Sequence, residues 1–330
     1  MRRLASPLLV FLALLMLAEP ETGHAAGTPD APLIVAVMPF KNQTEAKKYD
    51  WLGFGVADSL ASKLSSTRKF AVVERTQLRS VLQELKLADS GLIDESAAPE
   101  LGKMLGAKTM IIGLFAPVES GGRVQVRFMT KLVDTETTKV LSASGARANG
   151  ALDDIFKLEE MIALGIVEGL GVKIEPADRE IMSRDECKSL LAYEFYSQSL
   201  METDAEVRKR LLQRALQHDP EYGRAHLALA YLIYLNTPPS QPAPELIGHI
   251  KKVLRADPNQ PQAAYLLASY LDRQLKRAGR DAASLKRARI AIKYYRKFVE
   301  LEAASPMRLT QGKVKRSRQR IEKLAKQFGP

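Results

Sequence analysis

Buried-strand and amphipathic-helix patterns alternate through the first half of the chain. The apolar run Pro32–Phe40 predicts a buried strand, and apolar residues at helical spacing predict a helix over Trp51–Ser66. The same patterns predict a strand over Lys69–Glu74, helices over Arg75–Leu87 and Ala97–Leu105, strands over Lys108–Ala116, Val124–Thr135 and Lys139–Ala148, and a helix over Leu152–Leu170. This order predicts a sheet covered by helices, an α/β sandwich.

The second half of the chain repeats itself. A segment that begins at Leu216 aligns with one that begins at Leu254, a shift of 38 residues that superimposes Asp-Pro on Asp-Pro and alanine on alanine. This pattern resembles the tetratricopeptide repeat, whose unit has about 34 residues. The expected helix pairs are Cys187–Met201 with Ala205–His218, Tyr222–Leu235 with Pro244–Ala256, and Gln262–Arg277 with Ala283–Glu302, followed by a capping helix over Lys313–Phe328. The alternative is a plain helical bundle.

The N-terminus has the pattern of an export signal. Two arginines precede the apolar run Leu8–Ala18 and a site of small residues near Ala25, which predicts a signal peptide over residues 1–25. The cleavage site has no cysteine, so we expect no lipid anchor. The predicted organisation is this signal peptide, an α/β domain over 31–172, a linker over 173–186, and an all-α, tetratricopeptide-like (TPR-like) solenoid over 187–330 with a basic capping helix.

Several motifs of the predicted α/β domain resemble a known family. VMPFKNQT, FAVVERTQLRSVLQEL, LGKMLGAKTMIIG and KLVDTETTKVL are similar to the periplasmic domain of the curli-secretion (CsgG) family and its FlgO-like and TolB N-terminal-like relatives. The resemblance covers about Leu33–Val172 and implies an envelope protein that binds or assembles, without catalysis. The chain lacks the lipidated cysteine and an extra pair of strands long enough for a membrane barrel, so no pore function is expected.

Candidate catalytic residues are few. Glu74 and Arg75 follow a predicted strand, where α/β enzymes often hold catalytic groups. Acid–base chemistry needs a second titratable group in reach, and the mature domain has no histidine, so we expect a solvated or paired helix start. The lone Cys187 has no histidine partner nearby. Without metal-ligand spacing among His218, His226 and His249, we expect no enzyme, no metal and no cofactor.

The formal net charge of +11 is concentrated at the C-terminal end. From Arg273 onward there are 18 Lys and Arg against 4 Asp and Glu. An exported protein seldom meets nucleic acid, so this surface is expected to meet anionic lipid, cell-wall polymer or an acidic protein. The alternative is a merely solvated end of the chain. The candidate basic stripe comprises Lys286, Arg289, Lys293, Arg296, Lys297, Arg316 and Arg320.

A stack of helical repeats presents a concave groove to its partners. The candidate groove residues are Arg224, Tyr231, Tyr234, Gln262, Ser269 and Arg273, with the alternative that the tyrosines merely pack between helices. Together these patterns favour an exported, unlipidated periplasmic adaptor or scaffold that binds a protein or peptide in secretion or envelope assembly. The second hypothesis is a ring-forming, oligomeric subunit of an envelope machine. An enzyme is the hypothesis with the least support.

Overall fold

The computed structural model describes residues 31–84, 96–141, 146–184, 187–239, 241–275 and 279–329. The expected signal peptide therefore lies outside the described residues. Pro32–Pro330 form one compact unit. Among the described residues, every helix is too short or too polar to cross a membrane.

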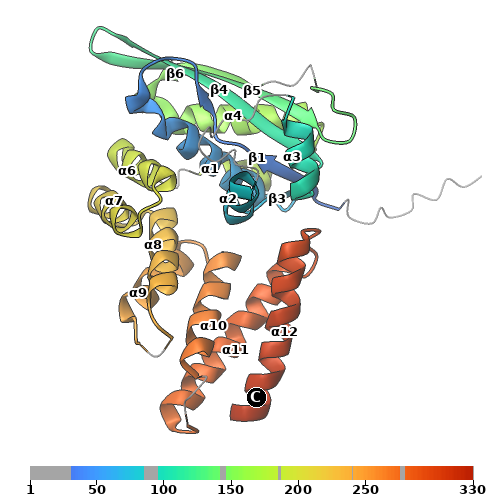
Figure 1. Cartoon of the computed structure of the whole chain (residues 1–330), viewed down its shortest axis with the longest axis vertical. Helices are drawn as coiled ribbons and strands as arrows, with labels where there is room; N and C mark the ends of the chain where they lie inside the picture. The colour runs from blue at the N-terminus through green and yellow to red at the C-terminus, as the bar shows by residue number, and fades with distance from the viewer. Residues whose placement is uncertain are drawn as a thin grey trace, which may run out of the picture. The chain divides into compact units, whose positions relative to one another are not determined.

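A mixed sheet forms the centre of the first region (Figure 1). Its strands are β1 (Leu33–Val37), β2 (Lys41–Asn42), β3 (Phe70–Val72), β4 (Thr109–Ser120), β5 (Arg123–Asp134) and β6 (Arg147–Ala151). Strands β3, β1 and β4 run parallel, whereas β4, β5 and β6 are antiparallel neighbours in that order, and β2 pairs with β4. Gly121 and Gly122 form the tight β4–β5 turn with φ angles of 57° and 76°, which glycine adopts without strain.

The segment predicted as a strand over Lys139–Ala148 pairs with β5 at both of its described ends. Val140 forms a bridge with Val133, and β6 begins at Arg147. Residues 142–145 of the predicted strand lie outside the described residues. The side chain of Asp134 accepts hydrogen bonds from the backbone N–H groups of Glu136 and Thr137. This turn, stabilised by an aspartate, joins β5 to the segment that begins at Lys139.

Helices cover both faces of the sheet. Helices α1 (Trp51–Ser65) and α4 (Ile155–Gly169), the latter preceded by the short turn η3 (Leu152–Asp154), belong to one core, and α2 (Arg75–Glu84) and α3 (Ala98–Leu105) belong to the other. Strand β1 shows why: its alternate residues enter opposite cores. A further short turn, η2 (Lys47–Tyr49), leads into α1. The predicted α/β sandwich is confirmed.

The second region consists of antiparallel helix pairs, as predicted. They are α6 (Leu190–Met201) with α7 (Ala205–His218), α8 (Gly223–Asn236) with α9 (Pro244–Ala256), α10 (Pro261–Leu275) with α11 (Ala282–Glu302), and the final helix α12 (Arg308–Phe328). The two repeated Asp-Pro sites have nearly the same backbone conformation: Asp219 ends α7 at φ −142°, ψ 92°, and Asp257 ends α9 at φ −132°, ψ 96°. An all-α solenoid region is confirmed.

The expected linker contains a helix, α5 (Pro176–Met182). Glu175 and Asp178 form a capping box at its start, and the side chain of Ser189 accepts a hydrogen bond from the backbone N–H of Ala192 to cap α6. The polar pattern Ser183–Glu186 predicts a capping box that opens the next helix, but the structure places Ser183 at the C-terminal end of α5. Several polar residues suit a cap here, so local pattern alone did not decide between them.

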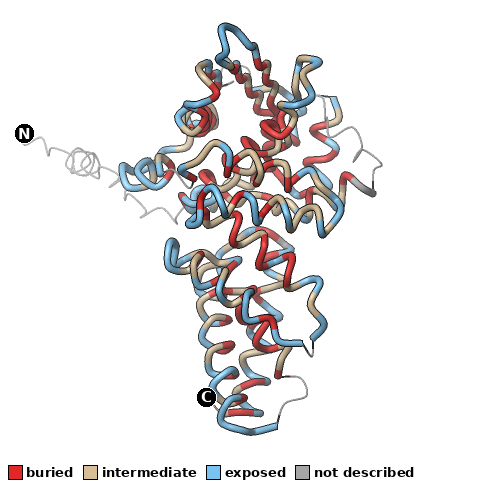
Figure 2. Tube along the Cα trace, turned by 90° about the vertical axis from the view of Figure 1, so that its left-hand side faces the viewer, coloured by how far each residue is buried: buried red, intermediate tan, exposed pale blue. Residues whose placement is uncertain are grey.

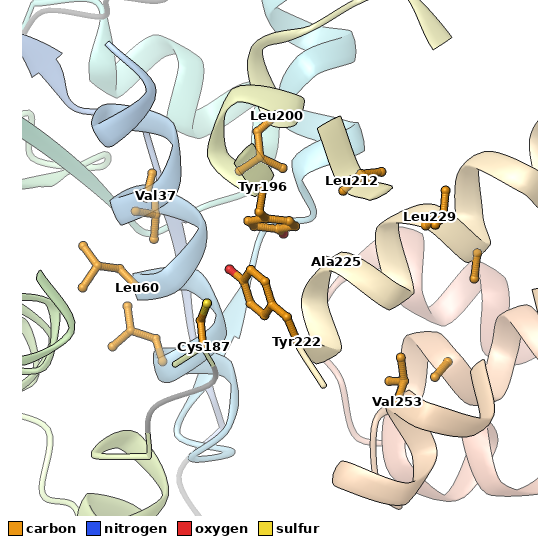
Figure 3. Packing of buried hydrophobic residues seen from close by; sticks show 14 of the residues in the cluster. Val37, Leu60, Cys187, Tyr196, Leu200, Leu212, Tyr222, Ala225, Leu229 and Val253 are labelled. Atoms are coloured by element: carbon orange, nitrogen blue, oxygen red, sulfur yellow. The ribbon is translucent and has the colours of Figure 1, made fainter. Parts of the chain in front are cut away.

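One apolar core continues from the sheet into the helix pairs (Figure 3). It includes Val37 and Leu60 on one side and Tyr196, Tyr222 and Leu229 on the other. At the contact between α1 and α6, an added Cβ on Gly55 would lie 2.2 Å from Ser197 Oγ and 2.6 Å from the Tyr193 hydroxyl. We call the contact of α1, α2 and α4 with α6, α8 and α12 the junction.

Candidate functional site

Glu74 and Arg75, which precede and begin α2, are structural residues of the junction. Lys313 of α12 donates from Nζ to both carboxylate oxygens of Glu74, at 2.6 and 2.8 Å. Arg75 Nη1 lies 3.6 Å from Asp58, and its Nη2 donates to the carbonyl oxygen of Leu200 at 2.9 Å. The arrangement is the paired helix start of the sequence analysis, with a partner that lies 239 residues away along the chain.

Asp58 of α1 joins three elements. Arg224 of α8 donates to its carboxylate at 3.0 Å, the Tyr196 hydroxyl of α6 donates to it at 2.7 Å, and Arg75 of α2 lies beside it. The side chain of Asp58 is 19% exposed and that of Arg224 is 13% exposed. Arg224 was a candidate groove residue, but the structure places its guanidinium in this internal ion pair.

A buried carboxyl group lies at the same junction. Glu159 of α4 accepts a hydrogen bond from Ser59 Oγ at 2.6 Å and one from the Tyr193 hydroxyl at 2.5 Å. Burial raises the pKa of Glu159 to about 7, although Arg224 opposes the rise. Sequence reasoning missed this residue, yet a signal was present: Glu159 lies beside Leu158 and before Ile162, within the apolar face of its helix.

One side of α8 carries apolar side chains that remain open to solvent. Tyr231 is 41% exposed and Leu235 is 58% exposed, whereas Ala225 and Leu229 on the opposite side are buried. Tyr234 is half-buried beside them. We call Tyr231, Tyr234 and Leu235 the α8 face. It retains two candidate groove residues and adds Leu235, which sequence reasoning did not select.

Two arginine side chains of α2 meet at the C-terminal end of α6. Arg79 of α2 donates from Nη2 to the carbonyl oxygen of Leu200 at 2.8 Å, the same oxygen that Arg75 contacts. Burial lowers the pKa of Arg79, and the positive charges of Arg75 and Arg208 lower it further. The two arginines of α2 therefore cap the C-terminal end of α6, where the helix dipole favours cations.

Arg208 of α7 links this group to α8. Burial lowers its pKa, as does Arg75, whereas the negative charge of Glu202 and the neighbouring Tyr231 raise it. Among the described residues, the Nε–H of Arg208 is buried without a hydrogen-bond acceptor. A buried donor without an acceptor costs free energy, so Arg208 is a group that an anionic ligand would stabilise.

The other candidate groove residues have different surroundings. Arg273 of α10 lies over the Tyr234 ring at 4.2 Å from its centroid and donates from Nη1 to the Tyr234 carbonyl oxygen at 3.0 Å. Gln262 is exposed and Ser269 is half-buried. The structure thus brings Arg273 to the α8 face, while Gln262 occupies the first turn of α10.

The candidate basic stripe divides into exposed and paired residues. Lys286, Arg289, Lys293 and Arg296 are exposed on α11, Lys297 is half-buried, and Arg316 is exposed on α12. Arg320 differs, because its Nε donates to Asp272 of α10 at 2.6 Å and its Nη2 pairs with the other oxygen of that carboxylate. This internal ion pair places Arg320 in the contact between α10 and α12.

Two histidines that the sequence placed on separate helices meet in space. His226 Nδ1 lies 2.8 Å from His249 Nδ1, and His226 Nε2 lies 2.9 Å from the Pro220 carbonyl oxygen. Burial lowers the pKa of both rings. Within the described part of the chain, no group of three or more His, Cys, Asp or Glu converges as a metal site. Cys187 is buried, and burial raises the pKa of its thiol to about 12.

Comparison with known proteins finds a similarity over the first region. The family model described as curli production assembly/transport component CsgG matches residues 17–152. Among solved structures, the LpoB C-terminal domain from Salmonella enterica (selenomethionine form) is similar, with 17% sequence identity and a TM-score of 0.26. The match covers 38% of this chain and 85% of that chain. No curated protein matches. The predicted resemblance is confirmed: the chain has a CsgG-like domain followed by a helical region.

Proposed function

We propose that this protein is an exported, unlipidated periplasmic adaptor that binds a protein or peptide partner through its helical repeats, in secretion or in assembly of the envelope. The observation that carries the proposal is the α8 face. Tyr231 and Leu235 leave 41% and 58% of their surface exposed, beside the half-buried arginine Arg208. The CsgG-like domain over residues 17–152 supports the envelope location.

The chemistry of the α8 face defines the kind of partner. Exposed aromatic and aliphatic side chains bind apolar side chains, and tyrosine and arginine are common anchors of protein interfaces. Arg208 supplies a buried N–H without an acceptor among the described residues, and a carboxylate would satisfy it. We therefore propose a partner segment that combines acidic and apolar residues.

A photo-crosslinking amino acid in place of Tyr231 tests the proposal in the intact envelope. The same amino acid in place of Val118, which is 57% exposed on β4, is the control. We expect a partner that crosslinks at position 231 and not at 118. A Tyr231→Ala, Leu235→Ala double variant should then bind the purified partner at least roughly tenfold more weakly, because truncated anchors commonly cost over 1.4 kcal/mol.

The proposal fails if positions 231 and 118 give the same crosslinked products, or if the double variant binds the purified partner as tightly as the parent. Intact mass spectrometry of the exported protein tests the export and lipidation parts separately. A retained N-terminus or an attached diacylglyceryl group would contradict them.

The second candidate function is a ring-forming subunit of an envelope machine. The family description, an assembly/transport component, is the observation that favours it. Light scattering separates the two hypotheses: a ring keeps a large mass that is independent of concentration, whereas an adaptor has the mass of a single chain or a small oligomer. An enzyme has the least support.

A further inference from the structure

Helix α11 carries a row of exposed basic side chains along one side. Lys286, Arg289, Lys293 and Arg296 recur at i, i+3, i+7 and i+10, and each is exposed; we call these four residues the α11 stripe. The opposite side of α11 is buried, with Ala288, Ile292 and Tyr295 among its core residues. Figure 2 shows this alternation of buried and exposed sides in the helices near the C-terminus. The stripe spans about 15 Å along the helix axis, at about 1.5 Å per residue.

The α11 stripe has no acidic partner among the described residues, and this distinguishes it from other bases nearby. Lys313 pairs with Glu74 and Arg320 pairs with Asp272, whereas none of the four stripe residues lies within 4.0 Å of a carboxylate oxygen in a described ion pair. Like charges three and four residues apart on a helix repel each other. The stripe therefore slightly lowers the stability of its own helix, and no acidic residue of the described chain offsets this cost through an ion pair.

The surroundings of the stripe indicate the kind of partner. Of the large apolar side chains described on α11 and α12, Leu309 alone is exposed, at 38%. Protein interfaces need apolar or aromatic anchors at their centre, and α11 presents none. Lysine and arginine without such anchors suit a surface that offers many negative charges at adjustable positions, because lipid headgroups can diffuse to lie beneath each base.

We propose that the α11 stripe docks the protein on a membrane surface rich in anionic phospholipid. The exposed bases of α12, which packs against α11, strengthen the local positive potential. The contact is peripheral, since the helix has no exposed apolar side chain to insert. This inference goes beyond the proposed function and does not depend on what the α8 face binds.

Vesicle sedimentation with the protein purified from the envelope fraction tests the proposal. We expect binding to vesicles of phosphatidylglycerol with phosphatidylethanolamine at low salt, and none to vesicles of phosphatidylcholine alone. Raising the salt from well below ~0.15 M to ~1 M should release the protein, because the Debye length falls to about 3 Å. Each basic residue near an anionic membrane contributes about fivefold to partitioning, so Arg289→Glu, Lys293→Glu and Arg296→Glu together should lower it at least roughly 100-fold.

A matched variant controls for net charge. Arg123→Glu, Arg127→Glu and Lys139→Glu change the same number of charges at exposed positions of the α/β domain. This variant should retain most of the vesicle binding, and circular dichroism should show both variants folded. Equal losses in the two variants would overturn the proposal, because binding would then depend on overall charge.

A soluble polyanion tests the alternative that the α11 stripe binds an anionic polymer and not a membrane. Long-chain polyphosphate offers similar negative charge without a membrane. Vesicle binding that depends on the stripe supports the proposal. If the parent protein ignores phosphatidylglycerol vesicles at every salt concentration, the membrane proposal is wrong, and stripe-dependent binding to polyphosphate in that case would assign the stripe to an anionic polymer instead.

Discussion

The basic residues of the junction and those of the α11 stripe have opposite relations to acidic groups. At the junction, Arg224 shares Asp58 with Arg75, and Lys313 pairs with Glu74. Along the stripe, no such pair is found among the described residues. The difference shows that the basic residues at the C-terminal end are of two kinds: Lys313 and Arg320 pair with acids of other elements, and the exposed row has no such pair among the described residues.

The junction also shows what this pairing achieves. A part-buried charge without its partner costs several kcal/mol, while a paired one costs little. Polar contacts between α1 and α6 thus fix how the helix pairs attach to the CsgG-like domain. We predict that proteases cut preferentially in the segment 173–184, and limited digestion tests whether the two regions can separate.

The largest loss of stability is expected from Asp58→Ala. The change leaves Arg224, 13% exposed, and Arg75, 30% exposed, without their shared acid, and it removes the acceptor of the Tyr196 hydroxyl. We expect a loss of about 3 kcal/mol in the free energy of unfolding, by analogy with broken buried pairs. Urea denaturation measures it. Glu180→Ala breaks an exposed pair with Arg184 and should cost no more than about 0.5 kcal/mol; equal costs would mean that burial does not govern the junction.

A slightly smaller effect on the free energy of unfolding is expected from Glu159→Gln, and it should depend on pH. The pKa of Glu159 is about 7 in the folded protein, above the 4.5 that is usual for glutamate. A raised pKa stabilises the fold fully below about pH 4.5, and this contribution is lost as the pH rises through about 7. Glu159→Gln should therefore flatten the pH dependence and stabilise the protein near pH 8 by up to roughly 3 kcal/mol, since one pKa unit corresponds to about 1.4 kcal/mol.

Denaturant melts near pH 5 and near pH 8 provide the measurement, with Glu168→Gln at an exposed position of the same helix as the control. The interpretation of Glu159 as a buried, protonatable link fails if its variant has the same pH dependence as the parent.

The contrast also explains which features the sequence could predict. The helices from α6 to α12 and the bases of the stripe follow from local periodicity, which one helix displays by itself. The junction pairs do not: Ser59 and Glu159 are 100 residues apart, and Glu74 and Lys313 are 239 apart. Periodicity predicts which face of a helix a residue lies on, but it does not predict which other helix or strand packs against that face.

The candidate site divides along the same line. The repeat pattern predicts Tyr231 and Tyr234 as groove residues, and they lie on a partly open face of α8. Arg224 and Arg320 fit the same periodicity, yet they form internal ion pairs with Asp58 and Asp272, respectively. The sequence signal for such a buried pair is an acidic or basic residue within the apolar face of a helix, as at Glu159. A buried charged group needs a partner, and that partner comes from another element.

Gly55 offers a more moderate test of the junction. An added Cβ there would lie 2.2 Å from Ser197 Oγ, so in Gly55→Ala the side chains of Ser197 and Tyr193, or α6 itself, must shift, at a cost of roughly 1–3 kcal/mol. An added Cβ on Gly248 in α9 would meet no other atom within 4 Å. Gly248→Ala should therefore stabilise the protein by about 0.5–1 kcal/mol, because alanine has the higher helix propensity. Thermal melts compare the two. A stabilising Gly55→Ala would mean that α6 does not pack closely on α1.

The smallest predicted effect concerns the stripe and has the opposite sign. Lys293 has Arg289 four residues before it and Arg296 and Lys297 three and four residues after it. Lys293→Glu turns three repulsive pairs into attractive ones, each of which changes by a few tenths of a kcal/mol, so we expect a gain of about 0.5–1 kcal/mol.

Lys157→Glu provides the reverse case, because Lys157 pairs with Asp154 at 2.9 Å and the substitution makes that pair repulsive. It should destabilise the protein by a similar amount in the same urea melts. A gain at position 293 together with weaker binding to anionic vesicles would show that the stripe is kept at the expense of stability. If Lys293→Glu instead destabilises the protein, the basic row contributes to the fold itself, and the distinction between the junction and the stripe does not hold.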